Sequence, residues 1–242
     1  MAVDTWKIES KHALQIHTAN TWFAPALKAF FAVFIPLAFL TVFLTAFLLS
    51  AQQVHAATAV EPPAATPELM AQLRKGGYVI YFRHATTELT GVADGAEDLS
   101  KCETQRNLSD AGRELATGIG KAIKHLNIPV GKVWSSPFCR CKDTANLIFG
   151  RFEIDKTLYF ALNVGDEERK RLTEAMRRML ATPPAAGTNT IIVSHSANLR
   201  EAAGLWPKPE GTAYIFKPLA GNNSEPVAKI LPTEWSQFAS QF

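Results

Sequence analysis

The sequence predicts an α/β fold: a three-layer sandwich with a mostly parallel central sheet flanked by helices, preceded by an N-terminal hydrophobic helix. Two observations lead to this fold class. From Thr66 onward, short apolar runs typical of strands alternate with longer segments of helical periodicity. Ahead of them, residues 29–49 form one uncharged apolar stretch. Because alternating strands and helices favour parallel strand connections, we expect helices on both faces of the sheet.

The apolar stretch 29–49 is about as long as a helix that crosses the roughly 30 Å hydrocarbon layer of a bilayer. Lysines precede it, and no Lys or Arg follows it until Arg74. The positive-inside rule therefore places residues 1–28 in the cytoplasm and the rest of the chain outside, in the periplasm.

Two interpretations of this stretch stay open. Residues 54–57, "VHAA", suit signal-peptidase cleavage after Ala56, whereas the apolar stretch is longer than a usual signal-peptide core. A cleaved signal peptide and a retained membrane anchor both fit. Residues 50–65 are rich in small residues and proline, as in a flexible spacer, so the folded domain is expected to span 66–242.

The first elements of the domain have clear boundaries. Thr66 caps a helix with Pro67 at its first position, and two glycines end it before the strand 78–82. After the loop 85–107, Ser109 caps a second helix. Its apolar residues recur at spacings of three and four and form one buried stripe: Ala111, Leu115, Ile119, Ala122, Ile123 and Leu126.

The remaining elements follow the same alternation. They are a strand over 132–136, a helix over 138–149, a charged surface helix over 166–180, a strand over 188–196, a helix over 197–204 and a strand over 212–218.

The net charge of +3 is too small to indicate a nucleic-acid partner, and aromatic and basic residues do not interleave as a strand-binding groove requires. Three cysteines are present: Cys102, Cys139 and Cys141. A bridge between Cys139 and Cys141 is geometrically awkward, so an oxidising compartment would join Cys102 to one of the other two. The spacings do not resemble a zinc site.

Unusual polar residues follow three of the predicted strands. These are "FRHA" at 82–85, "SSPFCR" at 135–140 and "VSHS" at 193–196. In α/β sheets, ligands bind outside the carboxyl ends of the strands. If the strands are parallel neighbours, the side chains that converge on one pocket are Arg83, His84, Arg140 and His195.

Such a pocket suits phosphoryl transfer without a metal or other cofactor. Two guanidiniums match the oxygens of a phosphate dianion. A neutral imidazole attacks phosphorus, and a second histidine, if protonated, stabilises the transferring oxygens. A lone Arg-His pair, or one histidine after a strand, is more often structural than catalytic, but here three such motifs fall at strand ends. The other histidines, His12, His17, His55 and His125, lie outside these motifs.

At these residues the chain resembles the histidine phosphatase superfamily, which includes phosphoglycerate mutase-like phosphatases. The resemblance runs through "RHA" (83–85), "LSDAGRELA" (108–116), "SSPFCRCKDTA" (135–145) and "IIVSHSANL" (191–199). It implies that His84 is the phosphorylated nucleophile, that Arg83 and Arg140 bind phosphate, and that His195 completes the pocket.

Two departures from the family pattern stand out. Ala85 replaces the glycine of the Arg-His-Gly triplet, and the glutamate motif that supplies the general acid in many members is absent. Seven carboxylates remain as candidates for the proton donor: Glu88, Asp94, Glu97, Asp98, Asp166, Glu167 and Glu168.

The leading interpretation is therefore an extracytoplasmic phosphomonoesterase that forms a phosphohistidine on His84 and acts on a phosphorylated small molecule or envelope component. The protein would also contact the membrane if residues 29–49 are retained. A mutase is the weaker enzymatic alternative, because its usual metabolites are cytoplasmic. The alternative from another class is an inactive phosphate-binding or envelope interaction protein of the same fold.

Overall fold

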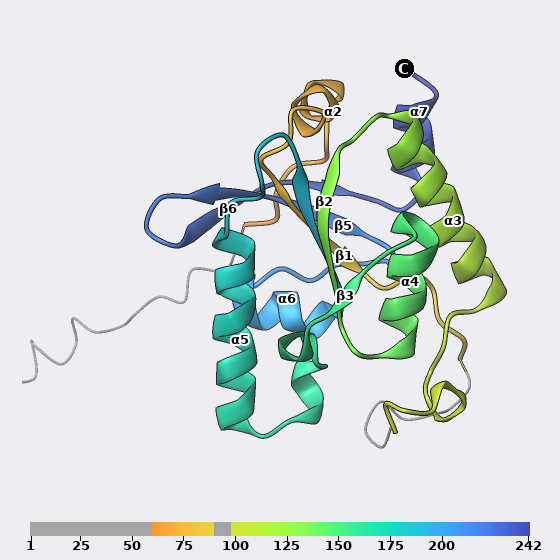
Figure 1. Ribbon diagram of the computed structural model, residues 1–242, viewed down its shortest axis with the longest axis vertical. Coiled ribbons are helices and arrows are strands. Elements are labelled where there is room, and N and C mark those ends of the chain that lie inside the picture. Colours follow the sequence, from red (N-terminus) through yellow and green to blue (C-terminus); the bar gives the residue numbers. More distant parts are fainter. Residues whose placement is uncertain (1–59, 90–97) are drawn as a thin grey trace, which may run out of the picture. The chain divides into compact units, whose positions relative to one another are not determined.

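The computed structural model describes residues 60–89 and 98–242, which belong to a compact unit spanning Thr58–Phe242 (Figure 1). The predicted hydrophobic helix 29–49 and the segment 1–28 lie outside the described residues, so membrane insertion and export stay predictions. None of the helices among the described residues has both the length and the apolar character needed to cross a membrane.

A six-stranded mixed sheet forms the centre of the domain. The strands are β1 Val79–Arg83, β2 Val130–Ser135, β3 Glu153–Ile154, β4 Asn189–Ser194, β5 Ala213–Leu219 and β6 Asn223–Ile230. Their order is β3-β2-β4-β1-β5-β6. The pairs β3-β2, β2-β4 and β4-β1 are parallel, whereas β5 runs antiparallel to both β1 and β6. The sheet is therefore mixed: five strands run in one direction, as the prediction of a mostly parallel sheet expects, and β5 alone runs the opposite way.

Helices cover both faces of the sheet, as the sequence predicts (Figure 1). One layer holds α2 Pro67–Leu73, α3 Asp110–His125, α4 Cys139–Phe149 and α7 Glu234–Ala239, and the other holds α5 Asp166–Ala181 and α6 Ser196–Ala203. Short 3-10 turns lie between these elements: η1 Cys102–Thr104, η2 Lys156–Leu158 and η3 Ala161–Asn163.

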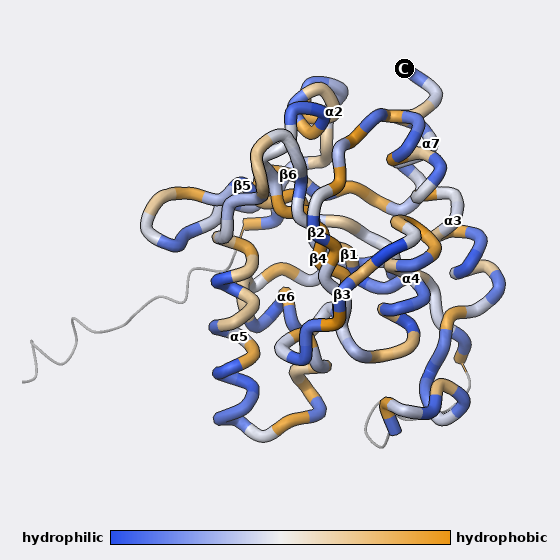
Figure 2. Tube along the Cα trace, in the orientation of Figure 1, coloured by the Kyte–Doolittle hydropathy of each residue, from blue (hydrophilic) through white to orange (hydrophobic). Residues whose placement is uncertain are grey.

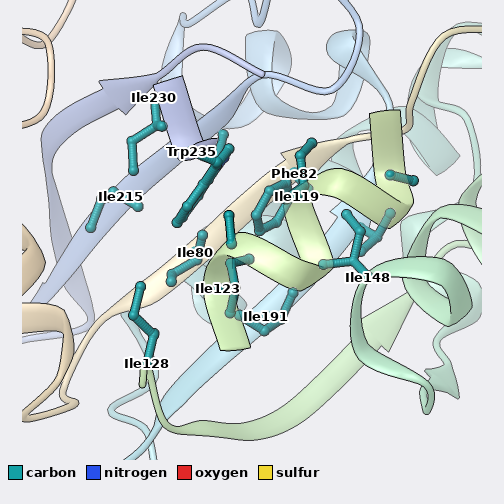
Figure 3. Packing of buried hydrophobic residues seen from close by; sticks show 14 of the residues in the cluster. Ile80, Phe82, Ile119, Ile123, Ile128, Ile148, Ile191, Ile215, Ile230 and Trp235 are labelled. Carbon is teal, nitrogen blue, oxygen red and sulfur yellow. The ribbon is translucent and has the colours of Figure 1, made fainter. Parts of the chain in front are cut away.

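The apolar run of β1 is continuous because both faces of this strand are buried. Ile80 and Phe82 pack into the core beneath α3 and α7, where Phe82 stacks on Trp235 with ring centroids 5.7 Å apart (Figure 3). Val79 and Tyr81 point to the opposite core, under α5 and α6. A strand buried on both faces shows no polar alternation, which is typical of the central strands of parallel sheets.

The predicted N-terminal caps of two helices and the buried face of a third are confirmed by specific contacts. The Thr66 hydroxyl accepts a hydrogen bond from the Leu69 amide, and the Ser109 hydroxyl accepts one from the Gly112 amide. Along α5, hydrophobic and hydrophilic residues alternate in stripes (Figure 2), and its buried side chains include Leu172, Met176 and Leu180.

The sequence patterns did not predict three elements: β3, β6 and α7. The strand β3 has only two residues, both exposed, and so carries no periodicity. The strand β6 mixes charged residues with Pro226, which favours a strand at the edge of a sheet. The helix α7 has six residues and is held mainly by the buried side chains Trp235 and Phe238.

Candidate active site

The carboxyl ends of β1, β4 and β2 lie side by side because the three strands are parallel neighbours in register. Arg83 pairs with Ser194, and Ser135 pairs with Val193. The residues that follow these strands therefore leave the sheet at the same edge. The structure brings together all four predicted site residues there, with the rings of His84 and His195 at a centroid distance of 5.6 Å.

His84 is held in one tautomer by the backbone. Its side chain is buried, with 2% of the residue exposed, and its Nδ1 lies 2.9 Å from the carbonyl oxygen of Ala85. Because a carbonyl only accepts hydrogen bonds, Nδ1 carries the proton and donates it. The lone pair of His84 is thus on Nε2, the nitrogen that could act as a nucleophile.

His195 has the complementary contacts. Its Nδ1 lies 3.4 Å from the Nη2 of Arg140, and its Nε2 lies 2.8 Å from the hydroxyl oxygen of Ser136. A guanidinium only donates, so Nδ1 accepts and Nε2 carries the proton toward Ser136. The neutral ring of His195 therefore carries its proton on Nε2, whereas the ring of His84 carries its proton on Nδ1.

Arg140 supplies the buried positive charge of the pocket. It is the second residue of α4 and is fully buried, and its guanidinium carbon lies 4.5 Å from the ring centroid of Phe138. The rings of Phe138 and Phe160 also pack against His195, at centroid distances of 4.9 and 5.0 Å. Aromatic rings tolerate a cation on their faces.

Burial lowers the pKa of His84 well below 6.5, and the nearby guanidinium of Arg140 lowers this pKa further. The same two causes, in the same order, lower the pKa of His195 well below 6.5. Both imidazoles are therefore neutral at neutral pH. The neutral form suits His84 as a nucleophile, whereas a charge-stabilising role of His195 would require its protonated form.

Arg83 faces the pocket from the end of β1 with a fixed guanidinium. Its Nη1 donates to the carbonyl of Pro207 at 3.1 Å, and its Nη2 donates to the carboxylate of Glu210 at 2.8 Å. Its Nε is buried and has no hydrogen-bond partner among the described residues. A buried donor without a partner is costly, which fits a group that binds an anionic ligand.

Two residues that sequence reasoning missed complete this side of the pocket, Glu210 and Arg106. Glu210 accepts hydrogen bonds from Arg83, from the Thr87 amide at 2.9 Å and from Arg106 at 3.4 Å. Its Oε1 is 4.0 Å from Nδ1 of His84. Arg106 also donates to the Thr87 hydroxyl. Neither residue belongs to a motif in the sequence. Glu210 lies in the connection between α6 and β5, directly before β5. If β5 ran parallel to β1, this connection would end at the opposite edge of the sheet, away from His84.

The predicted proton donors do not lie in this pocket where the structure describes them. Glu88, Asp98, Asp166 and Glu167 are exposed, and Glu168 pairs with Arg171 on the surface of α5. The other two candidates, Asp94 and Glu97, lie outside the described residues. The structure therefore assigns the role of proton donor to none of the described candidates.

Ala85 fits its position although it replaces a glycine of the family pattern. It is fully buried in the core, and its φ is not among the positive values found for Asn127 and Asn222 in the described residues. Its amide donates to the hydroxyl of Thr144 on α4 at 3.0 Å. The alanine thus requires no left-handed backbone and links the nucleophile's loop to the helix that carries Arg140.

A disulfide joins Cys102 to Cys139, one of the two bridges that the sequence left open. It links the turn η1 to the first residue of α4, directly before Arg140. Beside it, the buried side chain of Gln105 accepts a hydrogen bond from the Cys139 amide at 2.9 Å. The third cysteine, Cys141, is outside the disulfide, with its sulfur 3.7 Å from Nε2 of His195.

Together these contacts define a class of site: a buried cluster of two arginines and two histidines at the carboxyl edge of an α/β sheet that can bind an oxyanion and offer it a neutral imidazole nitrogen. Residues 79–163 match the histidine phosphatase superfamily (branch 1). The matched segment contains Arg83, His84 and Arg140, and its similarity to this superfamily indicates a phosphatase.

Several solved structures are similar to this chain at low sequence identity. The protein histidine phosphatase SixA in complex with tungstate shares 15% identity over 65% of this chain and 98% of its own, with a TM-score of 0.43. A phosphoserine phosphatase from Entamoeba histolytica in complex with 3-phosphoglyceric acid shares 16% identity over 63% and 95%, with a TM-score of 0.45. The alpha-ribazole phosphatase from Shigella flexneri shares 13% over 62% and 94%, with a TM-score of 0.42. No curated protein sequence matches the chain.

Proposed function

We propose that this protein is a phosphomonoesterase that transfers the phosphoryl group of its substrate to Nε2 of His84 without a metal ion. The observation that carries the proposal is the hydrogen bond from Nδ1 of His84 to the Ala85 carbonyl, which leaves Nε2 as the nucleophile beside Arg140 and His195.

The reaction has two steps. In the first, the Nε2 lone pair of His84 forms a bond to phosphorus and the bond from phosphorus to the ester oxygen breaks. The oxygen leaves with the bonding electron pair and takes up a proton from water. In the second, water attacks phosphorus, the bond from Nε2 to phosphorus breaks, and inorganic phosphate is released. Splitting hydrolysis in this way replaces one difficult displacement by two easier ones.

The guanidiniums of Arg83 and Arg140 would hold the phosphate oxygens through both steps. The buried Nε of Arg83 is one donor for this purpose. Because Arg140 is fully buried between aromatic rings, its charge acts in a medium of low dielectric constant and stabilises the transferring oxygens strongly.

The test is hydrolysis of an aryl phosphate by the purified protein in the presence of a chelator. We expect wild-type turnover to persist with the chelator, and His84→Ala to abolish it. His125→Ala is the matched control, because His125 is an exposed histidine on α3. Activity that disappears with the chelator would refute the metal-free mechanism.

The covalent intermediate separates an enzyme from a phosphate-binding protein of the same fold. We expect mass spectrometry after a rapid quench without acid to find phosphate on His84 in the wild-type protein. Saturable phosphate binding with no covalent adduct, and no turnover of any phosphate monoester, would favour the non-catalytic alternative.

We also propose that the domain acts outside the cytoplasm on a phosphorylated small molecule or envelope component. The apolar stretch 29–49 and the Cys102–Cys139 disulfide support this location, because disulfides persist in oxidising compartments. Cell fractionation with a thiol-labelling assay tests it: we expect the full chain in the periplasmic or membrane fraction with Cys102 and Cys139 protected. A reduced protein in the cytoplasmic fraction would contradict this location.

A further inference from the structure

We propose that Glu210 is a positioning residue that orients Arg83 and Arg106 toward the phosphate beside His84. This inference rests on the proposed function. It begins from the location of Glu210 in the connection between α6 and β5. The carboxylate has 17% of its side chain exposed and lies between the two arginines, whose side chains are 16% and 20% exposed.

The backbone around Glu210 is tied to the nucleophile. The amide of Gly211 donates to the carbonyl of His84 at 2.9 Å, and the amide of Arg83 donates to the carbonyl of Thr212 at 3.1 Å. Gly211 has a φ of +84°, a conformation that residues with a side chain rarely adopt. The chain therefore turns at this glycine and places Glu210 beside His84.

The carboxylate determines which donor of Arg83 faces inward. The Nη2 of Arg83 is bound by Glu210 and the Nη1 by the Pro207 carbonyl, so the two outer nitrogens are both occupied. The remaining nitrogen, Nε, is the buried one without a partner among the described residues. A guanidinium is rigid and planar, so fixing its two outer nitrogens also fixes the direction of the Nε–H bond.

The same carboxylate holds Arg106 and Thr87. Its Oε1 accepts from Nη1 of Arg106 at 3.4 Å, and its Oε2 accepts from the Thr87 amide at 2.9 Å. Thr87 lies three residues after His84, and Arg106 approaches from the loop before α3. Glu210 thus joins three separate segments around the pocket, and without it the two partly exposed guanidiniums could turn toward solvent.

These contacts make Glu210 unsuited to the role of proton donor. Both carboxylate oxygens already accept hydrogen bonds, and the carboxylate lies on the Nδ1 side of His84, whereas the attacking atom is Nε2. A leaving group departs in line with the attacking nitrogen, on the far side of phosphorus. We therefore assign Glu210 an indirect role through the arginines.

The test compares Glu210→Ala and Glu210→Gln with Glu174→Gln, a control that changes an exposed glutamate of α5. We expect Glu210→Ala to reduce kcat/KM by about 10²-fold, the size of effect expected when a reacting group is misplaced by about 1 Å. The glutamine oxygen can still accept from Arg83, so Glu210→Gln should lose less. Thermal melting curves establish that each variant is folded, and Glu210→Gln serves if Glu210→Ala does not fold.

Aryl phosphates with leaving groups of graded acidity separate positioning from acid catalysis. A positioning role predicts the same loss for every leaving group. A loss that grows as the leaving group becomes more basic would overturn the proposal in favour of a proton donor. We also expect Glu210→Ala to have little further effect in an Arg83→Ala, Arg106→Ala background, because residues that act through one another are not additive.

Binding of inorganic phosphate, measured by calorimetry, gives a readout that does not require turnover. We expect affinity to fall in the order wild type, Glu210→Gln, Glu210→Ala. If both variants bind phosphate as tightly as the wild type or more tightly, Glu210 merely repels the anion and the proposal is wrong. If the three phosphate affinities follow this order but the wild-type protein hydrolyses no ester, the proposed function is refuted and the positioning role is retained.

Discussion

His84 and His195 both follow a buried strand, yet their neighbours place the proton of the neutral ring on different nitrogens. The Ala85 carbonyl accepts a hydrogen bond from Nδ1 of His84, whereas the guanidinium of Arg140 donates to Nδ1 of His195. Each contact selects one tautomer of the neutral ring. The side chain alone does not determine which nitrogen has the free lone pair, because a neighbouring acceptor or donor makes that selection.

The lowered pKa of His84 predicts the pH dependence of activity. The free enzyme needs neutral His84, and a pKa well below 6.5 keeps it neutral in mildly acidic solution. We therefore expect kcat/KM, corrected for the titration of the substrate itself, to stay constant as the pH falls from 8 to about 6.5 and to decline only at lower pH. A decline centred at pH 6.5 or above would show that burial and Arg140 do not control this titration.

At the scale of elements, the segment "LSDAGR" positions α3 against the loop of the nucleophile. Ser109 caps the helix and also donates two hydrogen bonds to the Thr86 carbonyl, from its amide at 3.0 Å and from its hydroxyl at 3.3 Å. Gly112, one turn later, lies against the same carbonyl, where a Cβ atom would be only 1.9 Å from the oxygen. The motif is therefore structural and fixes the chain two residues after His84.

Gly112→Ala should therefore disturb this contact. We expect it to lower the free energy of unfolding by about 1–3 kcal/mol, as overpacking does, and to reduce kcat/KM by moving Thr86. Gly118→Ala on the same helix is the control, since a Cβ there meets nothing within 4 Å. It should stabilise the protein by about 0.5–1 kcal/mol. Denaturant unfolding measures both values, and equal effects of the two substitutions would contradict the packing argument.

At the scale of the whole molecule, the disulfide connects the peripheral loop before α3 to the centre of the site. It closes a loop with a sequence separation of 37 residues, from Cys102 to Cys139. That loop contains Arg106, α3 and β2, so the bridge restricts a large part of the unfolded chain. The next residue is Arg140, which binds His195.

Replacing both bridging cysteines by serine should lower the free energy of unfolding by about 3–4 kcal/mol, on the loop-entropy account of cross-links. Reducing agent should destabilise the wild-type protein similarly and leave the Cys102→Ser, Cys139→Ser variant unchanged. Denaturant unfolding with and without reductant checks this. A wild-type protein that is insensitive to reductant would indicate that the bridge contributes no stability.

The local patterns of the sequence were sufficient for most elements and for four residues of the site. The helix caps at Thr66 and Ser109 and the apolar run of β1 are local signals, and each is confirmed. The predicted stripe of α3 is confirmed at its C-terminal half, whereas Ala111 is exposed because the first turn of the helix presents Gly112 to the protein interior. Arg83, His84, Arg140 and His195 were predictable because parallel strands bring their carboxyl ends to one edge. The export segment 29–49 remains a prediction from hydropathy and charge.

By itself, the sequence determined the α/β class, the central strands and the four side chains that meet at the candidate site, because burial, capping and strand ends depend on neighbouring residues. Only the tertiary structure decided the direction of β5, and with it the place of Glu210. The antiparallel pairing brings the start of β5 beside the end of β1, where Thr212 accepts from the Arg83 amide. Strand direction depends on pairing between residues more than a hundred positions apart, which no local pattern encodes.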